Sequence, residues 1–62
     1  MKGVMMKEKE CAEYLGFSVK KLRTMRKNNE IPFYVLGGNY YYKTTMIDAW
    51  IEQHLVSELN IN

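Results

Sequence analysis

The chain has 62 residues, which is enough for one small domain that hides about 60% of its unfolded surface on folding. Its single cysteine excludes an intramolecular disulfide, and no Cys/His cluster offers a metal site. The sequence has no signal-peptide pattern and no apolar run of membrane-spanning length. We therefore expect a single cytoplasmic domain over 1–62, with no membrane partner and no cofactor.

Charge is unevenly distributed along the chain. The formal net charge is only +2, but residues 18–27 contain five basic side chains and no acidic ones. The rest of the chain is therefore acidic overall. A cationic segment with helical spacing can neutralise the phosphates of nucleic acid and present side chains to base edges.

Two short helices are predicted in the first half of the chain. The first covers 7–15 and is followed by Gly16, which suits a left-handed helix end. Ser18 is a good N-cap for the second helix, about 19–28, whose apolar positions are Val19, Leu22 and Met25. Asn28 and Asn29 can end this helix, and Pro32 prevents its continuation. Met1–Met6 is read as an extended lead-in.

A β-hairpin and a third helix are predicted next. The runs 33–36 and 40–43 flank Gly37-Gly38-Asn39, which is a strong hairpin signal. Alternation places Tyr34, Leu36, Tyr40 and Tyr42 on one face, and Phe33, Val35 and Tyr41 on the other. Thr44 or Thr45 is expected to cap a helix over about 45–57 with an apolar stripe formed by Ile47, Trp50, Ile51 and Leu55. The tail 60–62 is expected to fray.

The spacing of Ala12, Gly16 and Leu22 meets the requirements of a helix-turn-helix. Two closely crossing helices need a small residue on the first, a glycine in the turn and a branched apolar residue on the second. The predicted fold class is mainly α with a small β-hairpin, a short winged helix-turn-helix.

The residues that meet these requirements also resemble a known family. The segment 11–18 (Cys-Ala-Glu-Tyr-Leu-Gly-Phe-Ser) is similar to the first helix and turn of excisionase-type, MerR-like winged-helix proteins. The resemblance continues through 29–32, 37–40 and 47–51. It implies a second helix in the major groove and a hairpin wing beside the backbone or the minor groove. Members of this family include recombination directionality factors of phages and mobile elements, and small transcription regulators.

The chain departs from the family pattern at several positions. The wing carries Asn39 and Tyr41 where the family often has arginines, so its usual DNA contact is weakened. Glu8 replaces a residue that is usually apolar, and Asn29 stands where glycine is common. We interpret these changes as affecting stability or partner choice more than fold.

The residues expected to bind DNA lie on the second helix and the wing. Lys20, Arg23 and Thr24 are expected to approach base edges, since arginine can donate two hydrogen bonds to guanine. Phosphate contacts are expected from Lys21, Lys27 and Lys43, and Ser18 is expected to place the helix start against the DNA backbone. Asn39 and Tyr41 remain candidate wing contacts. Arg26 lies closer to the apolar side, so its stem is expected to pack while its head reaches solvent.

The preferred function is sequence-specific binding of double-stranded DNA by an excisionase-like directionality factor. Such a protein assists an integrase and gains affinity from several copies on DNA. The nearest alternative is a transcription regulator with the same fold. A second alternative is a protein-interaction adaptor or inhibitor whose basic face binds an acidic partner. A single-strand stacking platform made of Tyr40, Tyr41 and Tyr42 is disfavoured, because alternation places two of them in the core. No nucleophile–base pair or ligand cluster supports an enzyme, and Cys11 is read as a small buried apolar residue.

Overall fold

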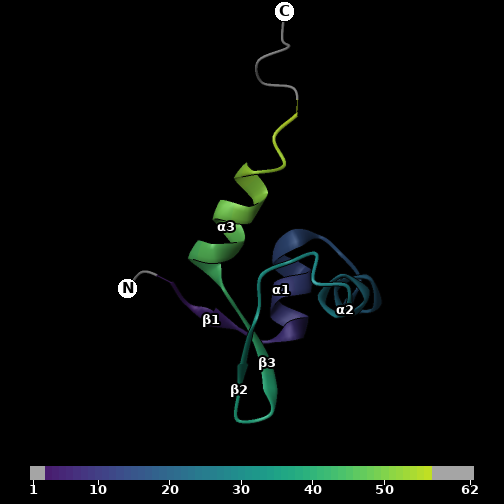
Figure 1. Cartoon of the computed structure of the whole chain (residues 1–62), viewed down its shortest axis with the longest axis vertical. Helices are drawn as coiled ribbons and strands as arrows, with labels where there is room; N and C mark the ends of the chain where they lie inside the picture. Colours follow the sequence, from purple (N-terminus) through teal and green to yellow (C-terminus); the bar gives the residue numbers. More distant parts are fainter. Residues whose placement is uncertain (1–2, 57–62) are drawn as a thin grey trace, which may run out of the picture.

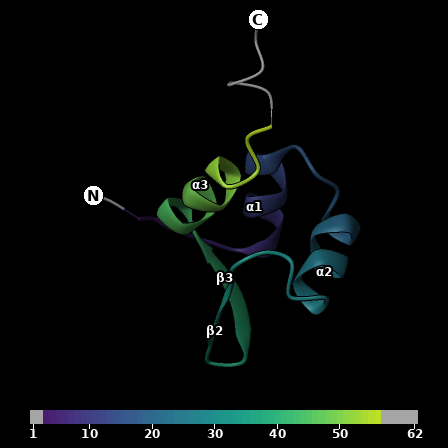
Figure 2. The ribbon, with the colours of Figure 1, turned by 45° about the horizontal axis from the view of Figure 1, so that its top comes forward.

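A computed structural model describes residues 3–56. The element order is β1 (Met5–Met6), α1 (Glu8–Leu15), α2 (Val19–Lys27), β2 (Tyr34–Leu36), β3 (Asn39–Lys43) and α3 (Thr44–Glu52). The strands form an antiparallel sheet in the order β1-β3-β2. The helices gather on one side of the molecule and the β2–β3 hairpin projects away from them (Figures 1 and 2). This arrangement is the predicted short winged helix-turn-helix, with one additional strand.

The two helices of the helix-turn-helix have the expected ends. Gly16 adopts φ 77°, and the amide N–H of Phe17 donates to the Ala12 carbonyl at 2.8 Å, so the last turn of α1 is closed. The Ser18 hydroxyl accepts from the Lys21 amide at 3.1 Å and caps α2. Asn29 has φ 57° beyond the end of α2, in the conformation that asparagine tolerates well.

The core lies where α1, α2 and α3 meet the sheet. Ala12 and Leu22 are both buried, as the predicted close packing of α1 and α2 requires. Cys11 is also fully buried, and burial raises the pKa of its thiol to about 11. The other buried residues are Met6, Ile31, Tyr42 and Ile47. Because Met6 is paired with Tyr42 in the sheet, the lead-in segment contributes a core strand and not only an extended approach.

The predicted faces of the hairpin were wrong. Tyr34 pairs with Tyr41 and Val35 with Tyr40, and residues directly opposite each other share a face. The loop contains two residues, Gly37 and Gly38, with φ 58° and 81°, as a type I′ turn requires. The sequence-based prediction counted Asn39 as a third loop residue, and this shift of one position reversed the face of one strand.

The reversed register changes which hairpin residues touch the core. Phe33, predicted to face outward, packs against the core and makes an edge-on contact with Tyr40, with 5.8 Å between the ring centroids. Tyr42 is fully buried, but Tyr40 remains 40% exposed and Tyr41 is half-buried. Only one of the three consecutive tyrosines is therefore a core residue.

Helix α3 also differs from its prediction. It begins at Thr44 and ends at Glu52, and neither threonine caps it; the N-cap residue is Lys43, with no capping side chain. The Thr44 hydroxyl accepts instead from the Val4 amide at 3.0 Å, so it holds the N-terminal segment. Ile47 is buried and Trp50 packs against the core, whereas Ile51, in the last turn of α3, and Leu55, beyond its end, are exposed. The predicted fraying of 60–62 lies outside the described residues.

Candidate nucleic-acid interface

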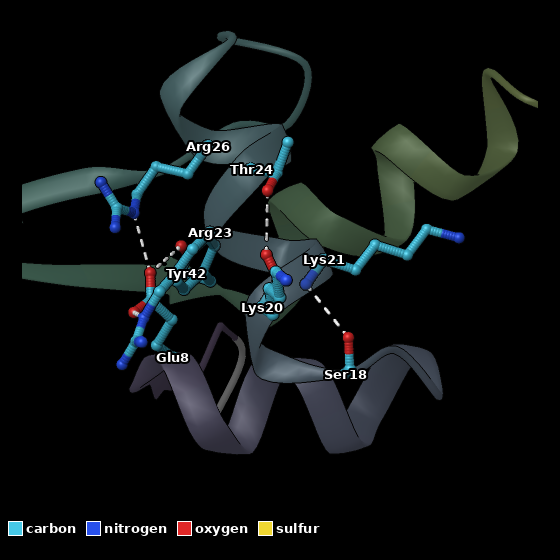
Figure 3. Close-up of polar contacts among 8 residues, drawn as sticks. All are labelled: Glu8, Ser18, Lys20, Lys21, Arg23, Thr24, Arg26 and Tyr42. Atoms are coloured by element: carbon cyan, nitrogen blue, oxygen red, sulfur yellow. Dashed lines mark hydrogen bonds and ion pairs between the residues drawn. The ribbon is translucent and has the colours of Figure 1, made fainter.

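Helix α2 has one apolar side and one polar, cationic side. Leu22 is fully buried, with Val19 and Met25 packed beside it. At 3.6 residues per turn the opposite side presents Lys20, Thr24 and Lys27, all of which are exposed. Lys20 and Thr24 lie along the same strip of α2 in Figure 3. The helix therefore exposes the residues that the sequence analysis singled out, on the side away from the core.

A hydrogen bond within α2 limits which atoms of the Thr24 side chain can contact a ligand. Its hydroxyl donates to the Lys20 carbonyl within the same helix, at 3.1 Å (Figure 3). The donor hydrogen is therefore occupied, and the methyl group and the oxygen lone pairs remain for a ligand.

Lys21 leaves α2 on a different side from the arginines. Its ammonium nitrogen lies over the ring of Phe17, 4.5 Å from the centroid, beyond the start of α2. In Figure 3 the Lys21 side chain extends away from Arg23 and Arg26. Apart from Arg26, the cations of residues 18–27 therefore spread around the exposed half of the helix. This spread suits contact with two phosphate strands flanking a groove more than it suits one tight anion site.

The opposite edge of α2 is organised by Glu8, the first residue of α1. Arg23 Nε donates to Glu8 Oε1 at 3.0 Å, and Arg26 Nε donates to Glu8 Oε2 at 2.8 Å (Figure 3). The Tyr42 hydroxyl donates to Glu8 Oε2 at 2.9 Å. We call Glu8, Arg23, Arg26 and Tyr42 the Glu8 cluster. It joins the start of α1, the middle and last turn of α2, and the strand β3.

Electrostatics within the Glu8 cluster favour the charged carboxylate. Burial by itself would raise the pKa of Glu8, but hydrogen bonds from Arg26, Arg23 and Tyr42 outweigh it, so this pKa lies below its usual range. Burial and the hydrogen bond to Glu8 raise the pKa of Tyr42. At neutral pH the cluster thus holds two guanidinium groups, one carboxylate and a neutral phenol.

Arg26 does not extend its head into solvent, contrary to the prediction from sequence. Its guanidinium lies over the Tyr40 ring, 3.7 Å from the centroid, and its side chain is only 11% exposed. The partners that hold it are Glu8 and an aromatic residue of the wing, so burial of the head is offset by an ion pair and a cation–π contact.

The wing lies on the same side of α2 as the Glu8 cluster. A cleft of about 300 Å³ separates the hairpin from the start of α1, and Asn39 and Tyr41 line it from the wing. Its other lining residues are Lys7, Glu8, Gly38 and Tyr40. Lys43 is at the other end of β3, about 13 Å along the strand from Asn39, where it pairs with Met5. The structure therefore brings Asn39 and Tyr41 next to the Glu8 cluster, and separates Lys43 from the wing tip.

Sequence reasoning did not identify Glu8 as part of this site. The available signal was a carboxylate at a position that the family usually fills with an apolar residue. Two arginines spaced three apart face the same side of a helix, and they supply the charge that such a carboxylate needs. The pairing could not be read from the sequence, because Glu8 lies 15 and 18 positions from its partners.

A comparison with protein families agrees with this fold. The sequence profile of the helix-turn-helix domain family matches residues 5–55, which include every described element from β1 to α3. The chain belongs to the helix-turn-helix domain family. Searches of curated proteins and of solved structures gave no significant match.

Because it belongs to this family, the chain is a DNA-binding helix-turn-helix protein, and its ligand is double-stranded DNA. Helices α1 and α2, joined by the turn at Gly16, are the two helices that define the motif. Within residues 3–56, no helix is long and apolar enough to cross a membrane, and no group of three or more potential ligands could hold a metal ion.

Proposed function

We propose that this helix-turn-helix domain binds duplex DNA sequence-specifically and acts as an excisionase-like recombination directionality factor of a phage or mobile element. The carrying observation is the exposed cationic side of α2, opposite buried Leu22. The wing contacts the same helix, since Tyr40 of the wing lies under the guanidinium of Arg26. In this fold the second helix enters the major groove with its early residues near base edges. The wing then lies beside the DNA backbone or the adjacent minor groove.

The roles of the individual residues follow from their places on the helix. Lys20 and Thr24, at the centre of the exposed strip, and Arg23, at its edge, approach base edges. Lys21 and Lys27 contact phosphates on either side, and the capped start of α2 at Ser18 directs backbone amides toward a phosphate. At the wing, Asn39 supplies a polar contact and Tyr41 lies against sugar. Lys43 binds phosphate further along β3.

The proposed role needs no chemistry from the domain itself. A single module of this size covers about 600–1,000 Å² of protein surface on DNA, which gives modest affinity. Several copies on adjacent sites, or an integrase bound nearby, would supply the rest. The whole of 1–62 acts as one domain in this proposal, and a transcription regulator would use the same contacts at a promoter.

A protein-interaction adaptor is the second candidate function, and the wing supports it. Tyr34, Val35 and Leu36 are all exposed, and the wing tip carries Asn39 where the family often has arginine. An exposed apolar strand is better suited to contact a protein partner than to contact a phosphate backbone. In that case the basic side of α2 would face an acidic protein surface.

Titration with duplex DNA separates these functions. The full chain is titrated with a pool of random 20-base-pair duplexes and with duplexes enriched from that pool by binding, each at 50 and 200 mM salt. We expect enriched duplexes to bind at least 100-fold more tightly than the pool, with a log-affinity slope of about −4 to −5 for four to six neutralised phosphates. Equal affinity for both would contradict sequence-specific recognition and favour the adaptor.

The location of the binding site separates the directionality factor from the transcription regulator. Footprinting on the DNA that flanks the gene would show protected positions in attachment-site arms for a directionality factor. Protection confined to a promoter would instead establish a regulator.

A further inference from the structure

The two arginines of the Glu8 cluster are held in different ways. Arg26 is nearly buried, and it is enclosed between Glu8 and the Tyr40 ring. Arg23 contacts the same carboxylate, yet its side chain is 58% exposed. Arg26 therefore serves the interior of the fold, whereas Arg23 is directed by Glu8 while remaining accessible to a ligand.

The hydrogen bond between Arg23 and Glu8 involves the inner nitrogen of the guanidinium. Arg23 Nε donates to Glu8 Oε1, and no other Arg23 atom donates to Glu8. A guanidinium has five N–H groups in a rigid planar fork, and its outer two nitrogens can together donate to the O6 and N7 atoms of guanine. Occupying Nε leaves that outer edge available and restricts the directions in which it can point.

Glu8 can direct Arg23 because it is itself held from the other side. Its second oxygen accepts from Arg26 and from the hydroxyl of the fully buried Tyr42. These contacts anchor the carboxylate to α2 and β3, and the Arg26–Tyr40 contact connects the same group to the wing. A side chain held by a charged partner that is anchored in the fold loses less freedom when it binds a ligand.

We propose that Glu8 is a positioning residue that sets the base preference of Arg23. This inference rests on the proposed function, in which α2 reads the major groove. Glu8 also places a negative charge near the DNA, which weakens attraction to phosphates of any sequence. Glu8 thus lowers affinity for random DNA and raises the preference for one base pair.

Selection from a randomised duplex library tests the proposal. A random 20-base-pair library is enriched by binding, at one salt concentration, to each of four proteins: the wild-type chain, Glu8→Gln, Arg23→Ala and Glu13→Gln. Glu13 is exposed on the same helix, so Glu13→Gln removes an equal charge away from Arg23. Arg23→Ala should identify the base pair that Arg23 reads. At that base pair, we expect Glu8→Gln to reduce the base preference by a factor of about five or more. Glu13→Gln should leave every preference unchanged.

Two further results are expected from the same variants. Glu8→Gln should bind the unselected library more tightly than the wild type does, with a steeper dependence on salt, because an opposing charge is gone. In the Arg23→Ala background, Glu8→Gln should cause no further loss of preference, since the residue through which Glu8 acts is absent.

Each contrary outcome has a distinct meaning. A wild-type chain that enriches no motif would overturn the proposed function, and this inference with it. A wild-type motif that Glu8→Gln retains in full would overturn this inference alone, as would identical behaviour of Glu8→Gln and Glu13→Gln.

A measurement on the wild-type chain covers the case in which Glu8→Gln does not fold. The Nε–H signal of Arg23 can be followed by NMR as an enriched duplex is added. We expect a slowly exchanging Nε–H both in the free protein and on DNA. Loss of that protection on DNA would mean that Arg23 leaves Glu8 when it binds, which overturns the proposal.

Discussion

The guanidinium of Arg26 lies over the ring of Tyr40, with its central carbon 3.7 Å from the ring centroid. This contact links α2 to the wing, two elements that are joined in sequence only through the loop 28–33. Phe33 meets the same ring edge-on. One exposed tyrosine therefore helps to hold the wing in its orientation relative to α2.

Tyr40→Ala is expected to destabilise the fold by about 1–2 kcal/mol, because it removes a cation–π contact and an aromatic pair. Urea unfolding monitored by circular dichroism measures this change in the free energy of unfolding. Tyr40→Phe keeps the ring and should remain within about 0.5 kcal/mol of the wild type. Equal losses in the two variants would assign the effect to the hydroxyl and contradict the role of the ring.

Arg23→Ala is expected to weaken binding to an enriched duplex by about 1–3 kcal/mol and to relax the preference at one base pair. Lys27→Ala provides the comparison, because a phosphate contact should be lost equally on all sequences and the salt slope should decrease by about 1. Competition binding against single-base-pair variants measures both effects. An unchanged affinity and footprint for Arg23→Ala would show that α2 docks by another face.

Thr44→Val is expected to loosen the attachment of the N-terminal segment to the start of α3. The Thr44 hydroxyl accepts from the Val4 amide at 3.0 Å, and the Thr44 amide donates to the Val4 carbonyl at 2.9 Å. Removing the first bond should cost about 1 kcal/mol and accelerate hydrogen exchange at the Val4 amide. Thr45→Val adds the same side chain one position later and should leave that amide protected. Equal exchange at Val4 in both variants would contradict the assignment.

Acid is expected to destabilise the fold in part through Glu8. The pKa of Glu8 in the folded protein lies below its ordinary value of 4.5. The unfolded chain therefore binds a proton first as the pH falls, and the stability that Glu8 contributes is present above pH 4.5 and lost below it. We expect the wild type to have a larger free energy of unfolding than Glu8→Gln at neutral pH, and this difference to shrink toward low pH. Urea unfolding at pH 7, 5, 4 and 3 measures it. A constant difference across this range would contradict the linkage.

Local signals in the sequence were sufficient for the helix-turn-helix. Gly16, Ser18 and Asn29 each act through the backbone of their immediate neighbours, so residue type alone indicates where the helices begin and end. The burial of Leu22 and Ala12 followed from helical spacing. The cationic side of α2 was predictable for the same reason, because a helix of known phase fixes which side chains face away from its core.

Features that depend on register or on distant residues could not be predicted in this way. One misplaced loop residue, Asn39, reversed a face of the hairpin, since side chains alternate along a strand. Thr44 has the residue type of a helix cap, but its hydroxyl accepts a hydrogen bond from the amide of Val4, which lies forty positions earlier and directly before β1. The Glu8 cluster combines three segments whose proximity exists only in the folded chain.

The buried phenol of Tyr42 has a consequence for how such a chain can diverge. Its hydroxyl is satisfied by Glu8, whose charge is balanced by Arg26. Leucine at position 8 alone would leave the Tyr42 hydroxyl without a hydrogen-bond acceptor and the Arg26 guanidinium without its carboxylate inside the domain. The resulting loss in the free energy of unfolding is one that a fold of this size tolerates poorly. Positions 8, 26 and 42 are thus expected to covary, passing between a polar set and an apolar set as a unit.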